Sequence, residues 1–307
     1  MLNVMTEVND KEKFVFEVGK ILPTLCHNFV TRIVAVRDDG SYEHRGTALL
    51  CQFGSQKTFV TALHVITEIE EDSNIQSWGI GAKSEDGFVD VLRLTEIDIA
   101  VIVPRDDFTP KDDLNFWSAA QSDDNSELLP HDYLLVHGYP DSFARYTTFL
   151  PGFVAEAYTH CASIRPRESE FSAEALEVFK EQIPYYLPVP DKLMKPSQFA
   201  INYAEDTGPL KTPEGKVITD ESTLKDHSQL YSDGPALPGQ LKHGAFGLSG
   251  SPVWRFGAYE CNWGVKNWSE THARITGIVT GWNEGNKILI ATPFCEFASR
   301  VMAEGDF

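Results

Sequence analysis

Short apolar runs rich in β-branched and aromatic residues, separated by turn residues, dominate the first third of the chain. There are six, at about 29–36, 46–53, 57–61, 78–82, 88–94 and 99–103. Such runs are typical of strands, and the RDDGS segment at 37–41 is typical of a hairpin turn between the first two. Residues 12–22 predict a short helix that ends at Pro23, and the polar stretch that follows the strands predicts a linker at 111–130.

A second series of six runs follows, and one long interruption divides it. The runs lie at about 132–137, 146–159, 198–204, 251–256, 273–280 and 287–292. The interruption, an insert at about 160–242, carries an apolar residue at every fourth position, which predicts an amphipathic helix. These residues are Phe171, Ala175, Phe179 and Ile183. Residues 293–303 predict a C-terminal helix.

The two series, with no alternation of strands and helices, predict an all-β protein of two six-stranded antiparallel β-barrels. We expect an N-terminal helix and the first barrel within residues 1–110. Residues 131–307 are then expected to form the second barrel, with its helical insert and the C-terminal helix.

Composition narrows the choice of partners and compartment. Acidic residues outnumber basic ones by 45 to 26, and the net charge of −19 argues against nucleic acid or an anionic membrane as a partner. No run approaches the roughly 20 apolar residues that span a bilayer, and the N-terminal segment does not resemble a secretory signal. Five scattered cysteines without a C-x-x-C pair indicate reduced thiols and a cytoplasmic location. They are Cys26, Cys51, Cys161, Cys261 and Cys295.

Three short stretches carry residues suited to nucleophilic catalysis. His64 follows the third run, Asp98 immediately precedes the sixth, and Ser249 lies in the glycine-rich stretch HGAFGLSGSPVW at 243–254. A serine hydroxyl needs a base to take its proton, a histidine serves near neutral pH, and an aspartate orients the imidazole. In a tightly bent loop, the N–H groups of Gly247 and Ser249 can point into one concavity and stabilise an oxyanion.

Taken alone, Ser249 suits a turn, His64 a solvated surface and Asp98 the end of a strand. Taken together and in this order, the motifs TALH, DIAV and GLSGSP resemble the trypsin-like (chymotrypsin-fold) serine proteases. VHGYPD at 136–141 adds a distant similarity to bacterial HtrA-type relatives, so the resemblance is to the bacterial intracellular type. It covers about 28–104 and 131–295 without the insert.

The resemblance implies that His64, Asp98 and Ser249 form a catalytic triad in the cleft between two barrels. It also implies four substrate-binding residues: His243 at the base of the primary pocket, Thr280 and Gly281 alongside the substrate backbone, and Trp282 at the pocket rim. The side-chain preference stays open. His243 suits an acidic side chain, whereas Trp282 equally well narrows the pocket to small residues.

Two departures from the family pattern bear on activation. Animal trypsins carry a disulfide beside the histidine, where this chain has Val65, and an aspartate before the nucleophile, where it has Leu248. The ion pair that activates a trypsin zymogen is therefore absent. We expect the oxyanion loop to be ordered permanently, or by a partner or ligand.

The leading hypothesis is a cytoplasmic serine endopeptidase that cleaves a protein or peptide through an acyl-enzyme on Ser249. His64 would act as general base and acid, and Asp98 would orient it. The alternative is a catalytically silent trypsin-fold binding module, motivated by Leu248 and the long insert. An α/β-hydrolase is set aside because its nucleophile elbow needs glycine where this chain has Ser251.

We expect no cofactor and no metal, because the other histidines lack the spacing of metal ligands. The insert at 160–242 is a candidate surface for a regulatory protein or ligand, as in prokaryotic stress or antiviral systems.

Overall fold

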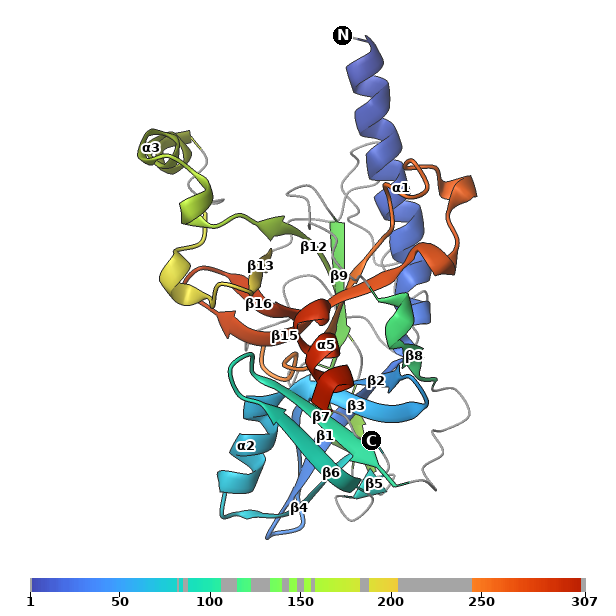
Figure 1. Cartoon of the computed structure of the whole chain (residues 1–307), viewed down its shortest axis with the longest axis vertical. Helices are drawn as coiled ribbons and strands as arrows, with labels where there is room; N and C mark the ends of the chain where they lie inside the picture. The colour runs from blue at the N-terminus through green and yellow to red at the C-terminus, as the bar shows by residue number, and fades with distance from the viewer. Residues whose placement is uncertain are drawn as a thin grey trace.

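Two β units, with helices around them, make up the described part of the chain (Figure 1). The computed structural model describes residues 2–81, 83–84, 88–105, 115–122, 133–139, 144–147, 152–155, 158–182, 188–203 and 245–304. The first unit occupies the lower part of the view in Figure 1, and the second lies above it.

The first unit is an eight-stranded sheet. Its strands are β1 (Val30–Arg37), β2 (Tyr42–Phe53), β3 (Gln56–Ala62), β4 (Ile75–Ile80), β5 (Lys83–Ser84), β6 (Phe88–Leu94), β7 (Ile99–Pro104) and β8 (Trp117–Ser118). They are ordered β5-β4-β1-β2-β3-β7-β6, and β8, which lies in the predicted linker, pairs with β2 in parallel.

This sheet curls like half a barrel but is not closed. Among the described residues, no ladder joins its edge strands β5 and β6, and β5 is only two residues long. The six predicted strands are all present, and the RDDGS turn joins β1 to β2, with Gly40 in the left-handed region at φ 78°. The prediction of a closed six-stranded barrel is therefore confirmed only in part for this half.

The second unit is a closed six-stranded antiparallel barrel, as predicted, with the strand order β12-β13-β16-β15-β14-β9. Its strands are β9 (Tyr133–Gly138), β12 (Tyr158–Arg165), β13 (Phe199–Asn202), β14 (Pro252–Arg255), β15 (Arg274–Asn283) and β16 (Ile288–Pro293). The single strand predicted at 146–159 is wrong. β10 (Ala144–Thr147) and β11 (Gly152–Ala155) pair only with each other, and the barrel strand starts at Tyr158.

The insert begins later than predicted. Because β12 continues to Arg165, the segment inserted before β13 is 166–198, and it contains helix α3 (Ala173–Gln182). The predicted helix is thus confirmed. It extends away from the barrel in Figure 1, and Val178 on it is 48% exposed. The rest of the predicted insert, 204–242, lies outside the described residues.

Helix α1 (Leu2–His27) is much longer than the predicted helix, and the expectation that it ends at Pro23 is wrong. An internal proline costs a helix about 3 kcal/mol. Phe14, Val18 and Leu22, one turn apart, are fully buried, and each such side chain contributes about 1.5–3 kcal/mol. Burial therefore outweighs the proline, and the helix continues through it.

Two further helices flank the sheets. α2 (Leu63–Glu71) directly follows β3, and its buried face consists of Leu63, Val65, Ile66 and Ile69. α5 (Phe294–Glu304) confirms the predicted C-terminal helix. Within the described residues, no helix has both the length and the apolar character needed to cross a membrane.

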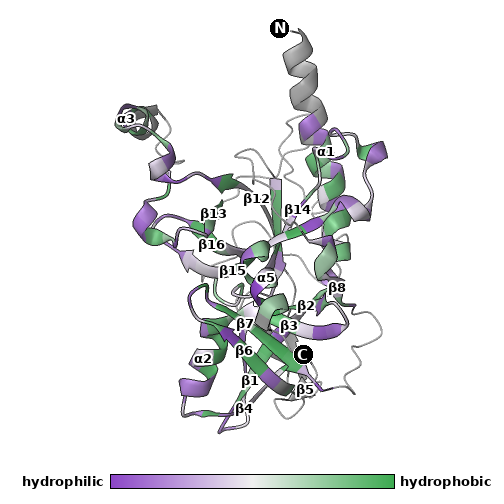
Figure 2. Ribbon diagram, viewed as in Figure 1, coloured by the Kyte–Doolittle hydropathy of each residue, from purple (hydrophilic) through white to green (hydrophobic). Residues whose placement is uncertain are grey.

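Both faces of the first sheet are buried, which joins the two units into one body. Along β2, Leu49 and Cys51 face a core shared with α1, α5 and the second unit, whereas Leu50 faces the inside of the curl. Ile99 and Ala100 divide in the same way on β7. Figure 2 shows the resulting concentration of hydrophobic residues along the central strands. The ends of β3 and β7 are thereby held against the second unit.

Candidate active site

His64 lies in the first turn of α2, immediately after β3. The helix has no side-chain cap of its own at Ala62, and the Oδ1 atom of Asp98 accepts a hydrogen bond from the His64 backbone N–H at 2.9 Å. An orphan N–H at the start of the helix is thereby satisfied from a neighbouring segment. The contact fixes the backbone of His64 relative to the aspartate.

Asp98 precedes β7 and has a left-handed backbone, with φ of 58°. Non-glycine residues rarely adopt this conformation, and strained backbone of this kind collects at functional sites. Its carbonyl accepts the N–H of Leu63 at 3.0 Å, so the main chain and the carboxylate both bind the start of α2. These bonds hold the strained residue in place.

Ser249, His64 and Asp98 form one continuous hydrogen-bonded chain. The Nδ1 atom of His64 is 2.7 Å from Oδ2 of Asp98, and its Nε2 atom is 2.9 Å from Oγ of Ser249. Because a carboxylate only accepts, Nδ1 carries the proton, and Nε2 is left to accept from the serine hydroxyl. This arrangement has the geometry of a nucleophile paired with its general base.

The surroundings of His64 act on its pKa in opposite directions. Burial lowers the pKa, but the hydrogen bond that His64 donates to Asp98, the charge of that carboxylate and the charge of Glu68 together outweigh burial. The pKa of His64 is therefore raised above its ordinary value of 6.5. A raised value makes the neutral imidazole a stronger base.

The loop that carries Ser249 is packed tightly against the first sheet. Its main chain turns sharply at Gly247 and Gly250, where φ is 86° and 88°. A Cβ atom on Gly250 would lie 1.9 Å from the carbonyl oxygen of Thr47 and 2.3 Å from the hydroxyl of Thr61. The carbonyl of Ser249 accepts the backbone N–H of Thr47 at 2.9 Å. Only glycine fits at position 250.

Leu248 anchors the same loop in the other half of the molecule. Its side chain is fully buried in the core of the second barrel, together with Val253 and Val279. The N–H of Gly250 donates to the carbonyl of Val279 at 2.7 Å. An apolar contact thus occupies the position for which a trypsin-like zymogen pattern would require an aspartate.

Between Gly247 and Ser251, two of the five N–H groups differ from the others in their hydrogen bonding. The N–H groups of Leu248, Gly250 and Ser251 donate to backbone carbonyls, whereas those of Gly247 and Ser249 have no backbone acceptor among the described residues. They are the two donors that the sequence predicted for an oxyanion.

The predicted substrate-binding residues differ in their surroundings. His243 lies outside the described residues. The Thr280 side chain is buried, and its hydroxyl lies 3.2 Å from both Thr292 Oγ1 and Gln198 Nε2, so only its main chain can serve a substrate. Gly281 pairs with Ile290 within the barrel.

Trp282 makes a contact that the sequence analysis missed. Its ring meets that of Phe246 edge-on, with centroids 5.6 Å apart, and Phe246 is 66% exposed. Phe246 immediately precedes Gly247, so this aromatic pair lies beside the candidate oxyanion donors. The feature of the sequence that could have indicated this contact is a single aromatic residue, Phe246, among the glycines of the loop.

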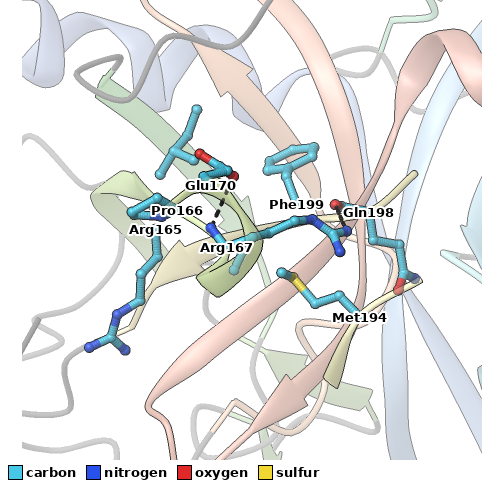
Figure 3. A pocket seen from close by; sticks show the side chains of 9 residues that line it. Arg165, Pro166, Arg167, Glu170, Met194, Gln198 and Phe199 are labelled. Atoms are coloured by element: carbon cyan, nitrogen blue, oxygen red, sulfur yellow. Dashed lines mark hydrogen bonds between the residues drawn. The ribbon is translucent and has the colours of Figure 1, made fainter. Parts of the chain in front are cut away.

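A separate cavity of about 170 Å³ lies between β12, β13 and the segment preceding β13 (Figure 3). It is lined by Ile164, Arg165, Pro166, Arg167, Glu170, Met194, Gln198, Phe199 and Ala200. Arg167 reaches across it and donates to the carbonyl of Gln198 at 2.6 Å, while its own N–H donates to Glu170. None of His64, Asp98 and Ser249 lines this cavity.

Among the described residues, no group of three or more His, Cys, Asp or Glu side chains is arranged to hold a metal ion. No protein-family model matches the chain, and no curated protein matches its sequence.

Proposed function

We propose that this protein is a serine endopeptidase of the trypsin-like type, built on a chymotrypsin-like fold. The observation that carries the proposal is the hydrogen-bonded chain from Asp98 through His64 to Ser249. It joins residues 34 and 185 positions apart, and it forms where a curled sheet meets a closed barrel. A structural role for a turn serine would not require this alignment.

In the proposed reaction, Oγ of Ser249 attacks the carbonyl carbon of a peptide bond while Nε2 of His64 takes the hydroxyl proton. The N–H groups of Gly247 and Ser249 donate to the resulting oxyanion, and one such donor is worth about 3 kcal/mol in serine proteases. His64 then gives the proton to the leaving amine, and an acyl-enzyme remains on Ser249. Water, deprotonated by His64, attacks the acyl carbon, and the proton returns to Ser249 as the acid leaves.

Asp98 keeps its negative charge throughout this cycle. Its Oδ2 atom accepts from Nδ1–H, which fixes the imidazole tautomer and stabilises the imidazolium as it forms. Its Oδ1 atom accepts the backbone N–H of His64, which fixes the main chain of the histidine relative to the carboxylate. Both oxygens of one carboxylate thus serve the same histidine.

The alternative of a catalytically silent binding module was motivated in part by Leu248. The full burial of Leu248 removes that motive, because the loop has an apolar anchor in place of an ion pair. We therefore keep the endopeptidase as the proposal.

The insert remains our proposed regulatory surface. A cytoplasmic location is supported by four cysteines that are thiols rather than disulfides, namely Cys26, Cys51, Cys261 and Cys295.

A peptide library incubated with wild-type protein and with Ser249→Ala tests the activity. We expect the wild type to cleave a defined subset of peptides and Ser249→Ala to cleave none of them. Ser299→Ala is the matched control, because the Ser299 hydroxyl only donates to the Cys295 carbonyl on α5. Cleavage that persists in Ser249→Ala, or no cleavage of any peptide by the wild type, would count against the proposal.

A further inference from the structure

Thr47 of β2 links the first sheet to the loop that carries the nucleophile. It is fully buried, and its hydroxyl lies 3.1 Å from the carbonyl oxygen of Gly247 and 2.9 Å from the backbone nitrogen of Tyr139. Gly247 and Tyr139 both belong to the second unit, where Tyr139 directly follows β9. One side chain of the first sheet therefore contacts two separate segments of the other unit.

The direction of both hydrogen bonds follows from the groups involved. A carbonyl only accepts and an N–H only donates, so the hydroxyl gives its proton to Gly247 and accepts from Tyr139. The backbone of Thr47 is also hydrogen-bonded. Its N–H donates to the carbonyl of Ser249, and its carbonyl accepts the hydroxyl of Thr61 at 2.8 Å. All the polar groups of Thr47 thus have partners.

A β-bulge explains why β2 presents Thr47 to the loop. Ile33 pairs with Gly46 and Val34 pairs with His44, so Arg45 is an additional residue on β2. A bulge bends its strand and changes the direction of the residues that follow. Thr47, two residues beyond Arg45, contacts the nucleophile loop.

We infer that Thr47 is a positioning residue that holds the oxyanion donors in place, an inference that rests on the proposed function. Its hydroxyl binds the carbonyl of Gly247 and its N–H binds the carbonyl of Ser249. With both carbonyls held on the Thr47 side, the N–H groups of these same two residues have no backbone acceptor among the described residues. The Thr47 hydroxyl holds the peptide group between Gly247 and Leu248, and the Thr47 N–H holds the one between Ser249 and Gly250.

This restraint complements the apolar anchor. The side chain of Leu248 fixes the loop to the second barrel, and Thr47 fixes it to the first sheet. The loop is therefore held from both units without an ion pair to a new N-terminus. Separation of the two halves would release the oxyanion donors.

The test compares Thr47→Val, Thr47→Ala and Thr47→Ser with the wild type. Valine keeps the shape but loses the hydroxyl, alanine loses both the hydroxyl and the methyl group, and serine keeps the hydroxyl. Thr58→Val is the matched control, because Thr58 is also fully buried and donates to the Cys51 carbonyl within the first sheet at 3.0 Å.

Loss of one oxyanion donor costs 10²–10³ in kcat, so a loosened loop is expected to cost Thr47→Val and Thr47→Ala about 10- to 100-fold. KM should change little, Thr47→Ser should recover most of kcat, and Thr58→Val should keep it. The acid limb of the pH profile should not move, because the contact between His64 and Asp98 is untouched.

Hydrogen exchange of the 245–251 backbone gives a readout that needs no activity. We expect faster exchange in Thr47→Val and Thr47→Ala than in the wild type, Thr47→Ser and Thr58→Val. The inference is overturned if exchange and kcat of Thr47→Val match the wild type, or if Thr47→Ser is as impaired as Thr47→Val. An inactive wild type whose exchange still follows this order would refute the endopeptidase and retain the restraint.

Discussion

Substitution of Gly250 by alanine tests how closely the nucleophile loop is packed against the first sheet. The new Cβ would lie 1.9 Å from the Thr47 carbonyl oxygen, and contacts of a Cβ below 3.0 Å are essentially never seen. The loop would therefore have to retreat by at least 3.0 − 1.9 = 1.1 Å. That movement breaks the hydrogen bond between the Thr47 N–H and the Ser249 carbonyl, which is now 2.9 Å long.

Three costs add up for Gly250→Ala. A left-handed conformation costs an L-residue about 1–2 kcal/mol, overpacking costs about 1–3 kcal/mol, and an unsatisfied buried group costs about 1–3 kcal/mol. Gly40→Ala is the matched control, because Gly40 has φ of 78° and nothing within 4 Å of its Cβ position. It carries only the first cost. The difference between the two variants should therefore be about 2–6 kcal/mol.

Urea denaturation of the two variants measures this difference, and turnover measures its effect on the site. A displacement of about 1 Å between reacting groups costs on the order of 10²-fold in rate, so Gly250→Ala should lose at least that much while Gly40→Ala keeps full activity. Equal stability of the two variants, with activity intact in Gly250→Ala, would refute the packing described for this loop.

Three further predictions concern charge and specificity. Because the pKa of His64 is raised and its neutral form is the base, the acid limb of the kcat/KM profile should have its midpoint above pH 6.5. In a pH–rate series, Asp98→Asn should shift this limb to lower pH and reduce kcat by about 10⁴-fold. Burial lowers the pKa of His44 to about 4 and that of His137, which also faces His27, to about 3. Between these folded-state pKa values and 6.5, each imidazole is neutral in the folded protein and protonated in the unfolded chain. The free energy of unfolding in urea should therefore fall by about 2 kcal/mol for each histidine between pH 7.5 and pH 5. The absence of such a fall would contradict their burial. Phe246→Ala should raise KM about 3- to 10-fold without changing kcat, because an aromatic contact is worth about 0.5–1.5 kcal/mol. An unchanged KM in steady-state kinetics would show that Phe246 does not contact the substrate.

Local patterns in the sequence predicted most of the strand positions. The apolar run at 287–292 corresponds to β16 (Ile288–Pro293), and the run at 88–94 coincides with β6. These strands are continuous and end at polar or turn residues, so neighbours along the chain define them. The three candidate catalytic residues were found in the same way, because each lies in a short motif next to a strand.

Features that depend on distant contacts could not be read in this way. Helix α1 continues through Pro23 because a buried face outweighs the proline, and the sequence around Pro23 does not show which distant segments bury that face. Helix α2 was missed because its β-branched residues continue the apolar character of β3, although Leu63, Ile66 and Ile69 recur every three residues.

The role inferred for Thr47 is a stronger example of the same limit. Its partners Gly247 and Ser249 are about 200 positions away, and nothing in the local sequence HRGTALL marks the threonine. Only the meeting of the two units brings these groups together. Likewise, closure of the barrel depends on pairing between strands, and the same strand pattern produced a closed barrel in one half and an open sheet in the other.

The central claim is that His64 activates the hydroxyl of Ser249, and reaction with a fluorophosphonate tests it most directly. Peptide mapping by mass spectrometry should place the label on Ser249 in the wild type, at a rate that falls steeply in His64→Ala. A wild-type protein that stays unlabelled, or a rate of labelling at Ser249 that is the same without the imidazole, would contradict the account.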